Sequence, residues 1–286
     1  MVIGHQKQWT FLQKLAEEGN FSHAYLFSGQ DKLGKKTLAL EWLSLIFGQP
    51  LFANGGIIHP DLFLIEPEEK TDSASVSTFA KASADKSTGK KEIRIAQIRE
   101  LKRKLSLKPH SAPFKAALID RAHLMNEETQ NSLLKILEEP RGNALLILIS
   151  EYPQYLLPTI LSRVEKIKFY PLGKKEIKNY LKKQGLAEGE QEEISRISFG
   201  RSGEAIDFIS DPQKLRAREK TEKELAAILR ADLAGKFQYA KELSQKKDLK
   251  EILDVWLAFF RENLMLKINQ KQPNILDYSP TKIKNI

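Results

Sequence analysis

The sequence predicts an α/β domain with a parallel sheet, followed by a small helical domain and an all-α C-terminal domain. Short apolar runs of strand length alternate with helical periodicities up to about residue 170, as in sheets whose parallel strands are joined by crossover helices. A glycine-rich loop separates the first such run from the helical pattern after it. Beyond residue 170 the apolar spacing is helical only. We therefore expect domains at residues 1–170, 171–211 and 212–286.

Size and composition narrow the class of protein. A chain of 286 residues has room for one large domain and one or two small ones. The absence of cysteine excludes disulfides and cysteine-ligated zinc. We find no N-terminal signal segment, and no apolar run approaches the roughly 18 residues that a membrane span needs. We therefore expect a soluble, cytoplasmic protein.

The chain is basic, with a formal net charge of +9 and a pI near 9.4. Such a balance favours an anionic partner, for example nucleic acid. However, lysines stand beside glutamates along the whole chain, which is equally typical of solvated helix faces. Both interpretations of the charge stay open.

The first elements lead up to the glycine loop. Residues 5–18 have the periodicity of an amphipathic helix, and residues 23–28 form a short apolar run of strand type. Apolar positions between residues 38 and 46 predict a helix directly after the loop. Strand, glycine loop and helix together are the context that a phosphate-binding loop requires.

The segment after this helix contains a second strand and an insertion. The apolar run at residues 61–66 predicts a strand that Pro67 stops. Residues 70–91 are rich in Ser, Ala, Lys, Thr and Asp and show no sustained apolar period. We expect a flexible surface insertion there, because such a composition cannot bury enough apolar area to offset the entropy of ordering. Helical periodicity returns at residues 93–105.

Three more strands complete the predicted sheet. Residues 115–120 are a buried strand that ends in an acid, and Asn126 is placed to cap a helix over residues 127–138. Residues 144–149 are almost wholly apolar, as expected when helices cover both faces of a parallel sheet. Residues 164–169 alternate between apolar and polar side chains, which predicts a fifth strand.

The remainder of the chain is predicted to be helical. Short helices are expected at residues 174–184, 190–198 and 202–209. Longer helical patterns follow from Pro212 onward. The apolar and aromatic positions at residues 252–266 are expected to form a helix–helix core rather than a cofactor site.

The loop GQDKLGKKT at residues 29–37 departs from a phosphate-binding loop at one position. In the pattern G-x-x-x-x-G-K-[ST], backbone amides cradle phosphates, the lysine reaches the terminal phosphates and the hydroxyl holds Mg²⁺. Gly29, Gly34 and Lys35 are in register. The hydroxyl position holds Lys36, and Thr37 follows one residue late.

A nucleotide-hydrolysing loop of this type also needs an acid on a second strand, and Asp120 takes that place. In ATPases of the AAA+ type the next residue is a glutamate that polarises the attacking water, and here it is Arg121. A guanidinium cannot accept a proton from water. The residues therefore indicate a degenerate nucleotide site made of Gly29, Gly34, Lys35, Thr37 and Asp120.

Several motifs make the resemblance to one family specific. The chain carries in order Gly4-His5, HAYLF at 23–27, the loop at 29–37, HPD at 59–61, LKP at 107–109, IDRAHLMNEETQNSLLKILEEP at 119–140 and LLPTILSR at 156–163. This series resembles the delta-prime family of bacterial DNA polymerase III clamp-loader subunits, from residue 3 to about residue 172. The combination of NSLLKILEEP with LLPTILSR is typical of AAA+ clamp-loader subunits.

The resemblance implies an AAA+ module, a small helical lid at residues 171–211 and a C-terminal helical collar at 212–286. It implies a hetero-pentameric ring with motor (gamma/tau) and delta subunits, which loads the sliding clamp onto primer-template DNA. In this family a Ser-Arg pair supplies an arginine finger to a neighbouring subunit's ATP, and the pair falls on Ser162 and Arg163. Val164 replaces the family's usual cysteine, a change that we do not expect to disable the finger.

Other departures from the family bear on cofactors. Many members of this family carry a four-cysteine zinc module where this chain has only QPLFANGGII at 49–58, so we expect no zinc. Glu204 stands where active relatives place a basic nucleotide sensor, and Glu151 beside Ser150 would repel phosphate. The five histidines have no paired ligand spacing, and we expect no metal site. The chain stops at PTKIKNI, so we expect a collar that is truncated or completed by partners.

We therefore expect a non-motor subunit that hydrolyses no ATP itself and contributes Arg163 to a neighbour. Whether the degenerate loop holds ATP, ADP or phosphate stays open. One alternative is an active AAA+ ATPase, such as a motor subunit of the same loader, and another is a DNA-binding adaptor with no loader role.

Overall fold

The computed structural model divides the chain into two compact units: the first contains Met1–Leu186 and Gly200–Gly203, and the second contains Ala187–Phe199 and Glu204–Ile286. The structure describes residues 3–53, 56–57, 59–69, 91–139, 144–246 and 248–269. The predicted insertion at 70–91 lies outside the described residues except for Lys91, and so does the tail at 270–286. The division into three domains stays a prediction.

The first unit contains the predicted parallel sheet. Five parallel strands lie in the order β4-β7-β8-β1-β9. Their bounds are β1 (Ala24–Ser28), β4 (Leu62–Ile65), β7 (Lys115–Ile119), β8 (Ala144–Ser150) and β9 (Glu165–Lys168). All five strands predicted from the sequence are confirmed. Because they run parallel, their carboxyl ends meet at one edge of the sheet, where such folds place ligands.

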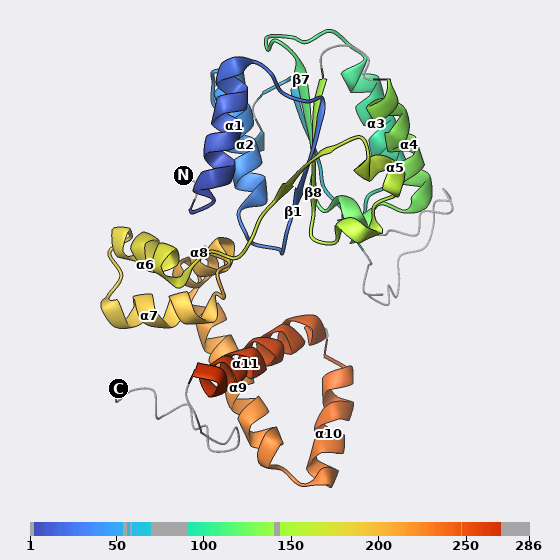
Figure 1. Cartoon of the computed structure of the whole chain (residues 1–286). Coiled ribbons are helices and arrows are strands. Elements are labelled where there is room, and N and C mark those ends of the chain that lie inside the picture. The colour runs from blue at the N-terminus through green and yellow to red at the C-terminus, as the bar shows by residue number, and fades with distance from the viewer. Residues whose placement is uncertain are drawn as a thin grey trace, which may run out of the picture. The chain divides into compact units, whose positions relative to one another are not determined.

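Helices cover both faces of this sheet (Figure 1). On one face lie α1 (Gln6–Glu18) and α2 (Lys35–Phe47), and on the other lie α3 (Ile95–Leu105), α4 (Glu127–Glu138) and α5 (Pro158–Leu161). The α4 helix begins as predicted, since the Asn126 side chain accepts a hydrogen bond from the Thr129 amide at 2.9 Å. This layered arrangement is the α/β fold that the sequence predicts.

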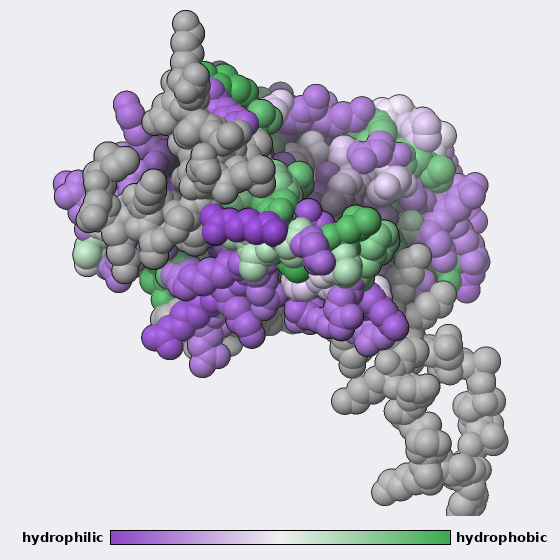
Figure 2. All heavy atoms as spheres, turned by 90° about the horizontal axis from the view of Figure 1, so that it is seen from below, coloured by the Kyte–Doolittle hydropathy of each residue, from purple (hydrophilic) through white to green (hydrophobic). Residues whose placement is uncertain are grey.

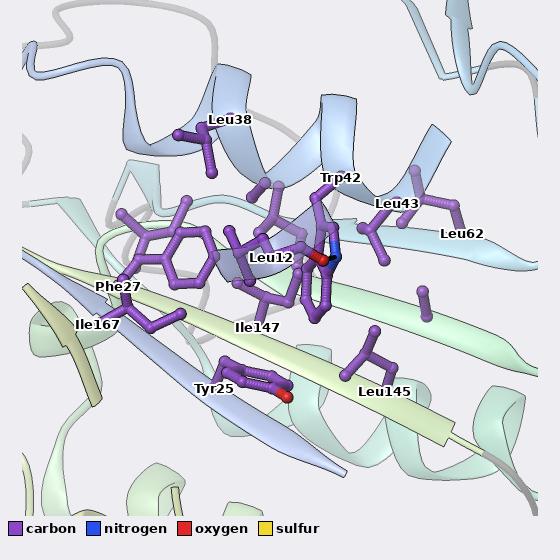
Figure 3. Packing of buried hydrophobic residues seen from close by; sticks show 14 of the residues in the cluster. Leu12, Tyr25, Phe27, Leu38, Trp42, Leu43, Leu62, Leu145, Ile147 and Ile167 are labelled. Atoms are coloured by element: carbon purple, nitrogen blue, oxygen red, sulfur yellow. Dashed lines mark hydrogen bonds between the residues drawn. The ribbon is translucent and has the colours of Figure 1, made fainter. Parts of the chain in front are cut away.

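Each face of the sheet has its own hydrophobic core. Tyr25 and Phe27 of β1 pack towards α1 and α2, whereas Ala24 and Leu26 pack on the opposite face, as the alternation of side chains along a strand requires. Trp42 lies at the centre of the first core, fully buried, and its Nε1 donates a hydrogen bond to the Leu12 carbonyl at 2.7 Å (Figure 3). These cores fix the strand ends that carry the site.

Two small hairpins flank the sheet. Between α2 and β4, β2 (Phe52–Ala53) pairs antiparallel with β3 (Gly56–Ile57). The strands β5 (Glu68–Glu69) and β6 (Lys91–Glu92) also pair antiparallel. The second hairpin brings together the two ends of the predicted insertion.

The HPD motif has a structural role in this fold. Asp61 is 1% exposed, and its carboxylate accepts hydrogen bonds from the backbone amides of His110, Ser111 and Ala112 at 2.8–3.0 Å. Burial tends to raise the pKa of Asp61, but the bonds from Ser111, His110 and Ala112 hold it below its usual value. Asp61 thereby anchors the loop that enters β7.

The remaining elements are helical, as predicted. The small helices are α6 (Lys174–Lys183), α7 (Glu188–Ile197) and α8 (Ser202–Ser210), and the long ones are α9 (Pro212–Arg230), α10 (Leu233–Ser244) and α11 (Leu249–Asn269). In the second unit α9 contacts both α10 and α11. Asp211 and Asp232 cap α9 and α10 through their side chains.

The apolar stripe of α11, predicted to be a helix–helix core, is only partly buried. Ile252 and Ala258 are buried, but Leu253, Leu257, Phe260 and Leu264 are 40–69% exposed. The helix is apolar over more of its circumference than its contact with α9 can cover. Within the described residues, no helix has both the length and the hydropathy needed to cross a bilayer.

Candidate functional site

The predicted phosphate loop connects β1 to α2 at the carboxyl edge of the sheet. Gly29 has φ +148°, and a Cβ there would lie 2.5 Å from the Phe169 carbonyl oxygen. Gly34 has φ +83° and forms the N-cap of α2. Both glycines are therefore required by the backbone itself, whether or not a phosphate binds.

The Lys35 side chain folds back onto the loop that precedes it. Lys35 is 5% exposed, and its Nζ donates hydrogen bonds to the Gly29 carbonyl at 2.8 Å and to the Gln30 carbonyl. Burial lowers the pKa of Lys35, while the nearby carboxylates of Asp31, Glu151 and Asp120 act in the opposite direction. The lysine that would reach a terminal phosphate is thus satisfied by loop carbonyls.

Lys36 occupies the position at which a phosphate-binding loop carries its metal-binding hydroxyl. Its Nζ lies 2.5 Å from Oε1 of Glu66 and 3.9 Å from Oδ2 of Asp120. Burial raises the pKa of the Asp120 carboxyl, and Lys36 and Arg121 counteract that effect. Thr37 is exposed on the next position of α2. The structure therefore brings Lys36, and not Thr37, to the predicted metal-holding acid.

Arg121 also points back to the loop. It follows Asp120 with φ +51°, and its Nη2 lies 3.6 Å from Oδ2 of Asp31, within the loop. All three cations of this corner, Lys35, Lys36 and Arg121, have partners on the chain itself. An incoming phosphate would compete with these contacts.

His123 lies beside the loop, a position that we did not predict. Its Nδ1 accepts long hydrogen bonds from the Ser150 hydroxyl and the Glu151 amide, both at 3.4 Å. Burial lowers the pKa of His123, with Glu151 opposing the effect. Ser150, the predicted polar group at the strand end, is fully buried and faces this imidazole. A spacing of three residues after the strand-ending Asp120 was the only available sequence signal.

Two contacts from outside hold the tip of the loop. His5 Nε2 donates to the Leu33 carbonyl at 2.9 Å, and the Gly203 amide donates to the Lys32 carbonyl at 2.7 Å. A Cβ at Gly203 would lie 3.0 Å from that carbonyl oxygen, so glycine permits this close approach. These contacts give a physical role to Gly203 and to the Gly4-His5 motif.

Arg163 lies elsewhere on the first unit, directly after α5. Its guanidinium donates from Nη1 to the Thr159 carbonyl at 3.0 Å and to the Ser162 hydroxyl at 3.4 Å. Its Nη2 lies 2.9 Å from Oε1 of Glu138, the last residue of α4, and the Arg163 side chain is 37% exposed. Ser162, the other predicted residue of the pair, donates its hydroxyl to the Thr159 carbonyl at 3.0 Å.

The α4 helix also holds the chain that leads into α5. The Gln130 side chain is 4% exposed. Its Nε2 donates to the carbonyls of Met125 and Tyr155 at 3.1 and 3.0 Å, and its Oε1 accepts from the Leu157 amide at 2.7 Å. The two sequence blocks that carry the family resemblance are therefore joined by one buried amide.

Two further predictions concern Glu204 and metal binding. Glu204 lies in the first turn of α8. Among the described residues, no three His, Cys, Asp or Glu side chains come close enough together to hold a metal ion.

Comparison with known proteins identifies the family. Residues 4–173 match the family described as "DNA polymerase III, delta subunit". The chain is 33% identical over 168 residues to the DNA polymerase III subunit delta′ of Pseudomonas aeruginosa, over 54% of this chain and 45% of that protein. It is 29% identical over 259 residues to the delta′ subunit of Bacillus subtilis, over 86% of this chain and 68% of that protein.

The fold also has a solved relative. A DNA polymerase III gamma subunit-related protein from Thermotoga maritima superposes with a TM-score of 0.51 at 19% identity, over 96% of this chain and 93% of that one. The α/β AAA+ fold class is thereby supported, together with the parallel sheet. The match to residues 4–173 covers more than half of the 286 residues. The two relatives from Pseudomonas aeruginosa and Bacillus subtilis are both delta′ subunits. The chain belongs to this DNA polymerase III delta-subunit family.

Proposed function

We propose that this chain is a non-motor subunit of the DNA polymerase III clamp loader, which supplies Arg163 in trans to the ATP of a neighbouring motor subunit. The observation that carries the proposal is a contrast in exposure. The Arg163 side chain is 37% exposed at the end of α5, whereas Lys35 of the chain's own phosphate loop is 5% exposed. A cation that acts on another subunit must be reachable from outside.

The proposed role suits the chemistry of arginine. In phosphoryl transfer, negative charge spreads over the oxygens of the γ-phosphate, and a guanidinium supplied by a second protein can stabilise it. The planar fork of donors suits phosphate oxygens, and the group stays protonated at any physiological pH. The effect of such an arginine lies mainly on the catalysed rate, because the charge develops in the transition state.

We further propose that this chain needs no nucleotide of its own. Lys36 stands near Asp120 where a metal ion would be held, and Arg121 replaces the residue that would activate water. Hydrolysis would require Lys35 to leave the carbonyls of Gly29 and Gln30. These three changes act on different parts of the reaction, so reversing one of them would not restore it.

The proposed partners are the motor (gamma/tau) and delta subunits in a hetero-pentamer, with the sliding clamp and primer-template DNA reached through the complex. The second unit supports association, because Leu233 and Phe237 of α10 are about 70% exposed and the apolar residues of α11 described above are 40–69% exposed. Hydrophobic surface lies between hydrophilic stretches on the face seen in Figure 2. Exposed apolar helix faces of this kind mark protein interfaces.

The test is the ATPase rate of the reconstituted complex with DNA and clamp. Arg163→Ala should lower the turnover number roughly a thousandfold at the site that it serves. Arg163→Lys should restore little, because an ammonium cannot reproduce the bidentate fork. Complex formation, followed by gel filtration, should be retained. An unchanged turnover number with Arg163→Ala in an intact complex would refute the role.

A further inference from the structure

We propose that Glu138 is a positioning residue for Arg163. Its carboxylate holds the guanidinium, between α4 and α5, in the conformation that a neighbouring subunit can reach. This inference rests on the proposed finger function. It assigns no contact between Glu138 and the nucleotide itself. Glu138 would act only through the arginine.

The contacts of Arg163 come from two kinds of neighbour. The Thr159 carbonyl and the Ser162 hydroxyl belong to the same turn of chain as Arg163. Glu138, at 2.9 Å from Nη2, is the contact that comes from a different helix. The two local contacts fix one end of the guanidinium, and Glu138 fixes the other. A guanidinium has more N–H donors than these contacts use, so donors are left for phosphate oxygens.

The backbone that carries Glu138 is itself fixed relative to Arg163. Leu133 and Leu137 of α4 are buried in the core below the helix. Eight residues before Glu138, the Gln130 side chain bonds the Tyr155 carbonyl and the Leu157 amide on the approach to α5. These contacts therefore hold in place the part of α4 that carries the Glu138 carboxylate. A freely rotating surface arginine would lose rotamer entropy when it engages a phosphate, and the ion pair removes part of that loss beforehand.

The exposure of the pair sets the size of the effect. The side chains of Arg163 and Glu138 are 37% and 47% exposed. Ion pairs this exposed shift an equilibrium by a factor of roughly five at most. The pair can therefore favour one conformation of Arg163 without blocking its use, and we expect a graded effect on turnover rather than an all-or-none one.

The test compares neighbouring acids in the reconstituted complex. Glu138→Ala should lower the turnover number roughly two- to fivefold and leave the KM for ATP unchanged, because the nucleotide pocket belongs to the motor subunit. Glu138→Gln retains an oxygen acceptor for Nη2 and should recover most of the loss. Glu139→Ala is the matched control, since it removes the adjacent acid at the end of the same helix and should behave as wild type.

A second measurement needs only the full chain. Nuclear magnetic resonance relaxation of the Arg163 Nε–H group should show a more mobile side chain in Glu138→Ala than in Glu139→Ala. Equal mobility in the two variants would overturn the inference, and so would a turnover number for Glu138→Ala that matches or exceeds the wild-type value. If Arg163→Ala itself left turnover unchanged, the proposed function would fail, whatever Glu138 does to the mobility of the side chain.

Discussion

Two cationic regions of the first unit differ in how accessible their charged groups are to another molecule. At the loop corner, Lys35 and Lys36 are held by groups of the same chain, and Lys35 is almost fully buried. At the end of α5, Arg163 is partly exposed and lies between two helix ends. Arg163 is also paired within the chain, so its difference from Lys35 is one of exposure and not of pairing. We propose that the loop corner is now structural and the arginine is functional.

This comparison predicts that changes at the loop corner affect stability rather than turnover. The largest such effect is expected for Gly29→Ala, because the added Cβ would lie 2.5 Å from the Phe169 carbonyl oxygen at φ +148°. We expect a loss of roughly 2–4 kcal/mol in the free energy of unfolding. Urea denaturation followed by circular dichroism would measure it.

Gly19→Ala is the matched control for this variant. Gly19 also has a positive φ, +63°, but a Cβ there would meet nothing within 4 Å. Only the left-handed backbone conformation is then penalised, by about 1 kcal/mol. Equal losses for the two variants would mean that the approach of the loop to β9 does not limit position 29.

A smaller effect is expected from the pH dependence of Asp120. Burial raises the folded-state pKa of this carboxyl, so its contribution to stability is fully present below the unfolded pKa and is lost as the pH rises through the folded pKa. Asp120→Asn removes that loss. The free energy of unfolding of the variant should therefore improve relative to wild type between about pH 3 and about pH 7, as measured by urea denaturation at both values.

The opposite trend would change the interpretation of Lys36. If wild type gained stability over Asp120→Asn as the pH rises, the ion pair of Asp120 with Lys36 and the nearby charge of Arg121 would outweigh its burial. The loop corner would then be stabilised mainly by the attraction between its oppositely charged side chains.

Much of the first unit could be predicted from the sequence. The central strands are buried on both faces and therefore apolar, as Leu145 to Ile149 in β8 are, which makes parallel strands visible without a structure. The strand β9 is mostly exposed and was predicted from its alternation of apolar and polar residues. Asn126 was recognisable as a cap because its side chain has a local backbone partner. Gly29, Gly34 and Lys35 were found because a loop motif is contiguous in sequence.

The partners of the site residues were harder to predict. Glu66 lies 30 residues from Lys36, and Glu138 lies in a different helix from Arg163, so no local pattern joins either pair. Glu66 had one usable signal, since it is the last residue of a predicted strand whose end lies at the ligand-binding edge. The exposed apolar face of α11 was predicted to be core, because periodicity shows that a helix face is apolar but not what covers it.

The most direct test compares Lys35→Met with Arg163→Ala in the reconstituted clamp loader, with DNA and clamp present and assembly checked by gel filtration. Lys35→Met keeps an apolar stem of similar length and removes the charge together with the hydrogen bonds from Nζ to the Gly29 and Gln30 carbonyls. The account predicts that Arg163→Ala lowers turnover at the site it serves roughly a thousandfold, while Lys35→Met leaves turnover near the wild-type value. The reverse result, a loss with Lys35→Met and none with Arg163→Ala, would contradict the account and identify the chain as an active ATPase.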